Sequence, residues 1–167
     1  LQVNAINRFP LHTNFFTYSP EDMVYEEGGK LVSRDLAQVN KAMSKNYLSL
    51  EGTWKFNWVA NADQRPTDFY KEDIDDSNWK TMNVPGIWEM NGFGDPEYVN
   101  IGFGWRGHFD QQPPAVPTKD NHVGSYRRII NIPENWDGKQ VVAHFGSVTS
   151  NIYLYVNGKF AGYAEDS

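Results

Sequence analysis

The segment 152–163 carries the strongest local fold signal in the chain: the pair Asn157-Gly158 lies between two runs of apolar and aromatic residues. Asn-Gly readily takes positive φ at both central positions, as a type I′ β-turn requires. A two-residue loop also fixes the strand register, so we expect Tyr155 to face Phe160. Both faces of the hairpin carry apolar side chains, which is typical of a strand pair inside a two-sheet sandwich.

Alternation of apolar and polar residues predicts further strands. In the clearest of them, Trp54, Phe56 and Trp58 lie on one face. The predicted strands cover residues 53–59, 125–132 (ended by Pro133) and 140–145. Neither a βαβ alternation nor an internal repeat occurs. We therefore expect an all-β fold.

The first fifty residues differ from the rest because Pro and Gly interrupt any period there. We interpret 1–50 as an extended arm with turns, and 51–167 as a β-sandwich. The arm could hold one short helix at 35–45, with Asp35 as its N-cap.

The composition limits the class of protein. The chain has 15 Lys+Arg against 21 Asp+Glu and a formal charge of −6, which argues against binding through nucleic-acid phosphates or anionic lipid. An apolar fraction of 40% is too high for a disordered tail. The absence of Cys excludes disulfides, thiolate metal sites and cysteine nucleophiles.

The chain shows no targeting signal. No run approaches the roughly 20 apolar residues needed to cross a bilayer, and residues 1–7 lack basic and apolar signal regions. Since there is also no initiating Met, we expect an excised or processed piece. A cytoplasmic and a periplasmic location both stay open.

No self-sufficient active site is visible. The acidic stretch 61–78 lacks the EF-hand order of ligands, so we interpret it as a solvated loop or helical turn anchored by its aromatics. The histidines show no zinc spacing, and we expect His144 to be a structural residue within a strand. A retaining glycosidase needs two carboxyls about 5 Å apart. Glu89 and Glu97 are candidates, but one sequence cannot show that they converge. The four histidines are His12, His108, His122 and His144.

The aromatic content suits carbohydrate. Six Trp and nine Tyr on a β scaffold could offer flat apolar faces to sugar rings, although aromatics also dominate protein cores. Residues 81–124 form a long stretch with little periodicity, of the kind that often carries function. Composition alone leaves a β-sandwich that could bind sugar.

Six segments, in order along nearly the whole chain, resemble the N-terminal domain of glycoside hydrolase family 2 β-galactosidases. Among them, Tyr98-Val99-Asn100-Ile101 resembles the family's Y-T-N-V, and the last twelve residues resemble N-G-x-x-V-G-Y-S-x-D-S. The segments are Ile6-Asn7-Arg8-Phe9-Pro10, Leu50-Glu51-Gly52-Thr53-Trp54-Lys55-Phe56, Val84-Pro85-Gly86-Ile87-Trp88-Glu89-Met90, Tyr98-Val99-Asn100-Ile101, Pro113–Pro117 with Gly124–Arg128, and Val156–Ser167.

The resemblance implies a galactose-binding-like jelly-roll sandwich, incomplete at its C-terminal end, with an extended arm. It implies that Asn100 is a substrate-binding residue, hydrogen-bonding sugar hydroxyls in an active site built mainly by a downstream barrel domain. This chain would hold no catalytic residue and no metal, while the parent enzyme would use magnesium and a monovalent cation. The parent would act on galactosides and form a homo-oligomer, without nucleic-acid or membrane partners.

Three positions depart from the family pattern. Ile87 replaces the usual Asn, 102–105 replaces a Tyr-Pro segment, and Gly146-Ser147 stands where an acid–Gly pair is common. The first two place the local sugar subsite in question. Other interpretations therefore stay open: a free-standing carbohydrate-binding module, a structural role in oligomer assembly, or the corresponding domain of a β-mannosidase or β-glucuronidase.

Overall fold

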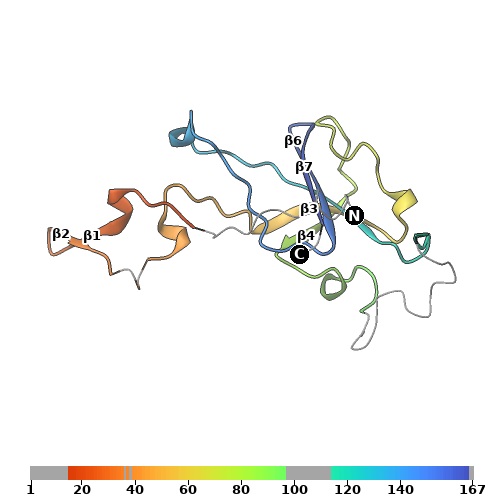
Figure 1. Ribbon diagram of the computed structural model, residues 1–167, viewed down its shortest axis with the longest axis horizontal. Coiled ribbons are helices and arrows are strands. Elements are labelled where there is room, and N and C mark those ends of the chain that lie inside the picture. Colours follow the sequence, from red (N-terminus) through yellow and green to blue (C-terminus); the bar gives the residue numbers. More distant parts are fainter. Residues whose placement is uncertain (1–14, 36, 38, 97–113, 166–167) are drawn as a thin grey trace. The chain divides into compact units, whose positions relative to one another are not determined.

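The computed structural model describes residues 15–35, 37, 39–96 and 114–165 (Figure 1). Within these residues the regular elements are β-strands and single 3₁₀ turns, and no α-helix occurs. The expected all-β class is therefore confirmed. No helical turn in this described part has the length or apolar character of a membrane span.

The chain divides into two compact units. The first comprises residues 1–50, 131–152 and 163–167, and the second comprises 51–130 and 153–162. The expected division into an arm at 1–50 and a sandwich at 51–167 stays a prediction.

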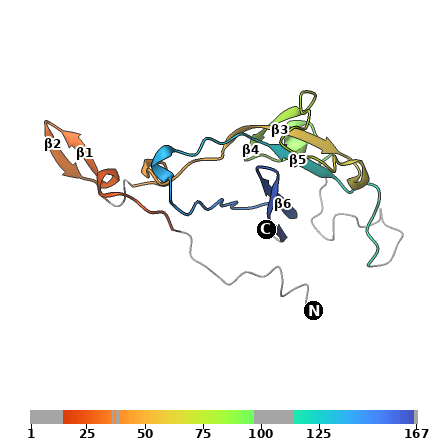
Figure 2. The same ribbon diagram turned by 90° about the horizontal axis from the view of Figure 1, so that it is seen from above.

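A three-stranded antiparallel sheet forms the centre of the second unit (Figure 2). Strand β3 lies between its two partners, so both of its edges are hydrogen-bonded, and Phe56 is opposite Lys80 on one side and Tyr126 on the other. The predicted strand at 53–59 is thus confirmed. The sheet comprises β3 (Gly52–Val59), β4 (Lys80–Val84) and β5 (Val123–Arg127).

The apolar core lies on one face of this sheet. Phe56 is fully buried, and Met82 and Phe93 are 2% and 8% exposed. Trp58, Trp88 and Tyr126 pack around these three. The alternation of strand side chains explains this arrangement, because Phe56 and its partners point to the same side.

Gly124 lets an indole approach the sheet closely. A Cβ atom at this position would lie 2.6 Å from Trp88 Cζ2 and 2.7 Å from a ring carbon of Phe56. The Trp88 indole N–H donates a hydrogen bond to the Tyr126 hydroxyl, and that hydroxyl lies 3.5 Å from Met82 Sδ. Any side chain at position 124 would displace Trp88 from the core.

The hairpin at the end of the chain forms as expected. Strands β6 (Asn151–Val156) and β7 (Lys159–Glu165) pair in a two-stranded sheet (Figure 1). Asn157 and Gly158 have φ values of 47° and 73°, the positive pair that a type I′ turn needs. The Tyr155 and Phe160 rings lie 5.4 Å apart.

The arm contains a hairpin that the sequence interpretation missed. Strands β1 (Val24–Glu27) and β2 (Lys30–Ser33) pair antiparallel around Gly28-Gly29, both of which have positive φ (Figure 1). The signal was present, since two glycines between short runs with β-branched and aromatic residues are a hairpin pattern.

The expected α-helix at 35–45 is wrong. The described residues of this stretch hold a 3₁₀ turn, Lys41–Met43, which Asn40 caps by accepting a hydrogen bond from the Ala42 N–H. Asp35 does cap locally, accepting from the Ala37 N–H at 3.0 Å. Nucleating an α-helix is unfavourable, and a segment this short forms too few intrahelical hydrogen bonds to offset that cost.

Two strand predictions also need correction. Strand β5 ends at Arg127 instead of continuing to 132, and residues 140–145, including His144, form no strand. Exposed apolar residues remain in both places: Ile129, Ile130, Ile132, Val141, Val142 and Phe145. A β-strand needs a neighbouring strand whose backbone N–H and C=O groups hydrogen-bond with its own, and these two segments have no such neighbour among the described residues.

Candidate functional site

The one substrate-binding residue expected from the sequence, Asn100, lies outside the described residues. What the structure describes is the two flanks of its segment: 93–96 on one side and 114–122 on the other. Both flanks belong to the second compact unit, as does the sheet formed by β3, β4 and β5.

The first flank is anchored by Phe93 and Gly94. Phe93 is buried and packs edge-to-face on Phe56, with ring centroids 4.7 Å apart. Gly94 follows with a φ of +76° and rests against Trp58: a Cβ added to Gly94 would lie 3.3 Å from Trp58 Cζ2. The chain thus leaves the core directly over the Trp58 indole.

The second flank returns to the same indole. The His122 and Trp58 rings lie 4.9 Å apart, and His122 is also near Gly94. One residue earlier, Asn121 forms a β-bridge with Asn61 and donates from its side chain to the Pro117 carbonyl. The Asn61 amide, oriented as a donor, lies 2.7 Å from the Thr118 carbonyl. Both flanks therefore meet at the end of strand β3.

The acidic stretch 61–78 is held by Arg127. The Arg127 guanidinium donates to the carbonyls of Phe69 and Lys71, at 2.6 and 2.8 Å, and to the Asp76 carboxylate at 3.1 Å. Lys55 adds a second cation 3.8 Å from Asp76. No local signal could have revealed this anchor, since its partners are more than fifty residues away. The interpretation as a loop anchored by aromatics holds, with this addition.

The aromatic anchors of that loop contact the terminal hairpin. Tyr70 and Tyr155 stack with centroids 4.8 Å apart and an interplanar angle of 17°, and Phe69 meets Tyr155 edge-on. Of the large aromatics on the hairpin, Tyr153 and Phe160 are each 58% exposed. The structure thus divides the aromatics between core and surface, a division that composition could not make.

The burial of Tyr126 has an electrostatic consequence. Desolvation raises the pKa of its phenol, while the hydrogen bond from Trp88 acts in the opposite direction. The phenol is therefore a neutral partner in the core at any physiological pH. Its role is structural.

The candidate acid–base residues do not converge in the described part of the chain. Glu89 is half-buried in the turn Glu89–Asn91, whereas Glu97 lies outside the described residues. His122 packs on Trp58, and His144 is exposed in an irregular segment. His12 and His108 are outside the description. No group of three His, Asp or Glu side chains there could hold a metal ion, so we assign no metal ligand.

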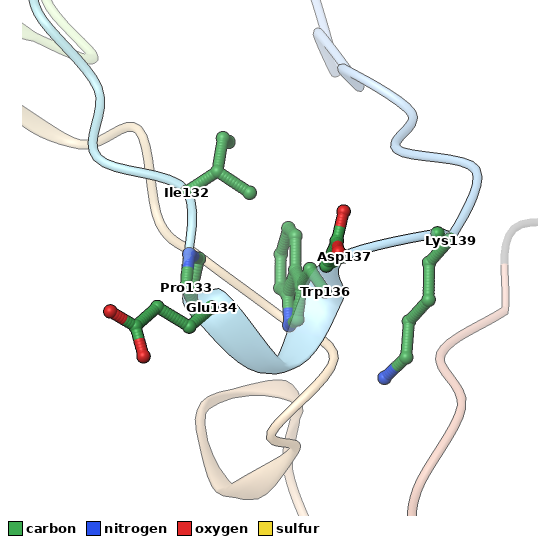
Figure 3. A pocket seen from close by; sticks show the side chains of 7 residues that line it. Ile132, Pro133, Glu134, Trp136, Asp137 and Lys139 are labelled. Atoms are coloured by element: carbon green, nitrogen blue, oxygen red, sulfur yellow. The ribbon is translucent and has the colours of Figure 1, made fainter.

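A pocket in the first unit offers no catalytic pair either (Figure 3). Its walls come from the single turn 132–139, and the side chains of Glu134 and Asp137 point in different directions. The Trp136 indole N–H donates to the Lys45 carbonyl at 2.8 Å, and Lys139 reaches Asn46 at 3.0 Å. These side chains therefore join the turn to the arm.

The described residues form an all-β domain whose central sheet is rich in aromatic side chains, and no catalytic centre occurs among them. Residues 47–167 match the family described as glycosyl hydrolases family 2, sugar binding domain. The chain belongs to this family.

Several proteins are similar to this chain over nearly all of its length. A β-galactosidase of Halalkalibacterium halodurans is 36% identical over 167 residues, which is 100% of this chain and 15% of that protein. A β-galactosidase of Lactobacillus delbrueckii subsp. bulgaricus is 35% identical over 99% of this chain and 15% of its own length. A β-galactosidase large subunit of Leuconostoc lactis is 30% identical, with 99% and 26% covered. The chain spans a small fraction of each relative.

Proposed function

We propose that this chain is the N-terminal, non-catalytic portion of a retaining β-galactosidase, which hydrolyses terminal β-D-galactosyl residues. One observation carries the proposal: the whole chain aligns with proteins named β-galactosidase while occupying 15% of the length of the first two. The catalytic carboxyls would then lie elsewhere on the polypeptide, on a barrel domain.

The proposed role of Asn100 is to hydrogen-bond substrate hydroxyls in that shared active site. A neutral hydrogen bond is worth about 1 kcal/mol, enough to orient a sugar but not to break a glycosidic bond. On either side of this segment, the described residues Gly94 and His122 lie beside Trp58 at the end of β3.

The proposal includes the partners that the resemblance implies. The full polypeptide would bind a galactoside, form a homo-oligomer, and use residues 1–50 for contacts between domains or subunits. Magnesium and a monovalent cation would belong to the parent enzyme, and we assign neither a ligand in this chain.

The first experiment compares this chain with the full-length polypeptide. The full-length protein should hydrolyse a nitrophenyl β-D-galactoside, and faster than the corresponding β-D-mannoside or β-D-glucuronide. The isolated chain should be inactive, because a retaining glycosidase needs two carboxyls about 5 Å apart. Turnover by the purified chain, or preference of the full-length protein for another sugar, would contradict the proposal.

The second experiment tests Asn100 in the full-length protein. Asn100→Ala should lower kcat/KM for the galactoside roughly fivefold, the equivalent of one neutral hydrogen bond. Asn151→Ala, an exposed amide in strand β6, is the matched control and should leave kcat/KM unchanged. Equal kinetics of the two variants would remove Asn100 from the substrate site.

A further inference from the structure

The chain contains two Asn-Gly pairs, and the structure places them in different surroundings. Asn157-Gly158 forms the two-residue turn of the hairpin β6–β7 (Figure 1). Asn91-Gly92 ends the 3₁₀ turn Glu89–Asn91. Both asparagines are exposed. Exposure therefore does not distinguish the two pairs, whereas their hydrogen bonds do.

The pair Asn91-Gly92 is held by hydrogen bonds on both residues. The Asn91 side-chain amide donates to the Ile87 carbonyl at 2.8 Å, and the Gly92 N–H donates to the Glu89 carbonyl at 3.3 Å. The next residue, Phe93, is buried in the core. This pair therefore cannot rearrange without breaking hydrogen bonds and disturbing the residues beside the core.

The pair Asn157-Gly158 lacks these restraints. Neither the Asn157 side-chain amide nor the Gly158 N–H has a hydrogen-bond partner in the part of the chain that the structure describes. Both residues lie outside the paired strands, at the tip of a two-stranded sheet. A turn in this position opens locally at a low cost in free energy.

We propose that Asn157 is a site of spontaneous deamidation, with water as the co-reactant. The Gly158 backbone nitrogen loses its proton to solvent and attacks Cγ of Asn157. An N–Cγ bond forms and the Cγ–Nδ2 bond breaks, so the nitrogen leaves as ammonia after taking a proton from solvent. Water then opens the resulting succinimide ring. Attack at Cγ gives aspartate, and attack at the main-chain carbonyl carbon gives isoaspartate.

Glycine favours this attack because it has no Cβ atom to shield its nitrogen, and because it adopts most backbone conformations at similar cost. The turn must leave its hairpin geometry briefly for the Gly158 nitrogen to reach Cγ of Asn157. Local opening therefore limits the rate. The hydrogen bonds at Asn91-Gly92 should slow the same reaction there, since they must break first.

The surroundings of Gly158 give the reaction a structural consequence. A Cβ added to Gly158 would lie 3.8 Å from a carboxylate oxygen of Glu72 and 3.8 Å from the Tyr70 carbonyl oxygen. Deamidation of Asn157 places a second carboxylate beside this contact, where it repels Glu72. Isoaspartate also lengthens the backbone within a two-residue turn and so disturbs the register that the turn fixes. The contact between Tyr70 and Tyr155 should loosen as a result.

The first experiment follows both pairs in the full-length protein. The folded protein is incubated in mildly alkaline buffer and digested, and mass spectrometry separates the amide, aspartate and isoaspartate forms of each peptide. We expect Asn157 to convert about tenfold faster than Asn91, the factor for breaking one or two hydrogen bonds before a turn opens. Equal rates at the two positions, or no conversion at Asn157, would overturn the proposal.

The same protein unfolded in denaturant is the matched control. Without the structure, the rates at Asn157 and Asn91 should converge, because each residue then precedes a glycine in an open chain. If the tenfold difference persisted in denaturant, the neighbouring side chains would be its cause, and the argument from the hydrogen bonds of the folded chain would fail.

Asn157→Asp tests the consequence of the new charge. The variant should exchange the backbone amides of β6 and β7 about twofold faster than the wild type, as expected for one exposed pair of like charges. Glu72→Gln in the same chain should cancel that effect. An effect of Asn157→Asp that is the same with and without Glu72→Gln would rule out repulsion between the two carboxylates.

Asn157→Gly tests whether the modification itself loosens the hairpin. Glycine accepts the positive φ of 47° at this position and has no side-chain amide to lose. After the alkaline incubation, amide exchange in β6 and β7 should be faster in the wild type and unchanged in Asn157→Gly. The same acceleration in both proteins would show that deamidation at Asn157 is not its cause.

Discussion

The two compact units are stabilised by different kinds of interaction. In the second unit the buried apolar residues are Phe56, Met82 and Phe93, gathered on one face of a sheet. Among the described residues of the first unit, the buried ones are polar: Asp22 and Ser44. Apolar burial thus dominates one unit, and hydrogen bonds from side chains to the backbone dominate the other.

The polar centre of the first unit lies at Asp22. Its carboxylate accepts hydrogen bonds from the backbone N–H groups of Ser19 at 2.8 Å and Lys45 at 3.2 Å. Ser44 donates to the Thr17 carbonyl close by. Each such bond is worth about 1 kcal/mol, less than the burial of an aromatic side chain. We therefore expect the largest effects of substitution in the second unit.

The largest expected effect is that of Phe56→Ala. The substitution removes the one fully buried large side chain of the described core and leaves a cavity under Trp88 and Tyr126, which should cost about 3–5 kcal/mol of unfolding free energy. Urea unfolding followed by tryptophan fluorescence measures the loss. Phe160→Ala is the control, since Phe160 is 58% exposed and should lose under about 1 kcal/mol. Similar losses for the two variants would remove the contrast between core and surface.

The second prediction concerns Arg127, which lies at the last residue of β5. Arg127→Met keeps the apolar stem but removes the three donors that hold residues 69–76, so it should cost about 1–3 kcal/mol. Arg65→Met is the control, because Arg65 is exposed and bonds only to the Ala62 carbonyl of its own turn among the described contacts. Hydrogen exchange should accelerate in 69–76 for Arg127→Met alone. Unchanged exchange there would show that the aromatic contacts suffice.

The third prediction is a pH dependence at Asp22, in the first unit. The Ser19 backbone N–H is the main cause that lowers the pKa of Asp22 below its ordinary value of 3.8. A carboxyl with a lowered folded-state pKa contributes stability above the ordinary value, and that stability is lost as the pH falls through the folded-state pKa. Below about pH 4, the Ser19 and Lys45 amides should therefore lose protection, measured as their exchange rate relative to that of an unstructured amide at the same pH.

Asp22→Asn tests this assignment. The variant should show low protection of the Ser19 and Lys45 amides already at neutral pH, with little further change in protection on acidification. Glu26→Gln, an exposed carboxylate in β1, serves as the control. Wild-type exchange in Asp22→Asn would show that the carboxylate does not hold the turn.

The sequence predicted the structure best where the residues that form a pattern are close together along the chain. The Asn157-Gly158 hairpin and the alternation around Phe56 were found because turn chemistry and side-chain period are written in adjacent residues. The same alternation at Val141 and Phe145 led to a wrong strand prediction, because a strand also requires a neighbouring strand to pair with.

The candidate site shows the same limit. The resemblance picked out the segment around Asn100, but not that Gly94 and His122 meet at Trp58, since those residues are separated by up to 64 positions in the sequence (58 to 122). The hydrogen bonds of Asp22 to Lys45 and of Arg127 to Phe69 are also non-local, with separations of 23 and 58 positions. Such contacts depend on the fold and cannot be read from periodicity.

The smallest expected effect is that of Val142→Ser, in the segment whose alternation resembles that of strand β3. Val142 is 75% exposed, so its replacement should change the unfolding free energy of this chain by no more than about 0.5 kcal/mol. The matched substitution is Val59→Ser, at the end of β3, where the side chain is half-buried beside a paired strand and should cost more. A loss above about 1.5 kcal/mol for Val142→Ser would mean that this segment packs against something in solution, and that its alternation marks a covered strand after all.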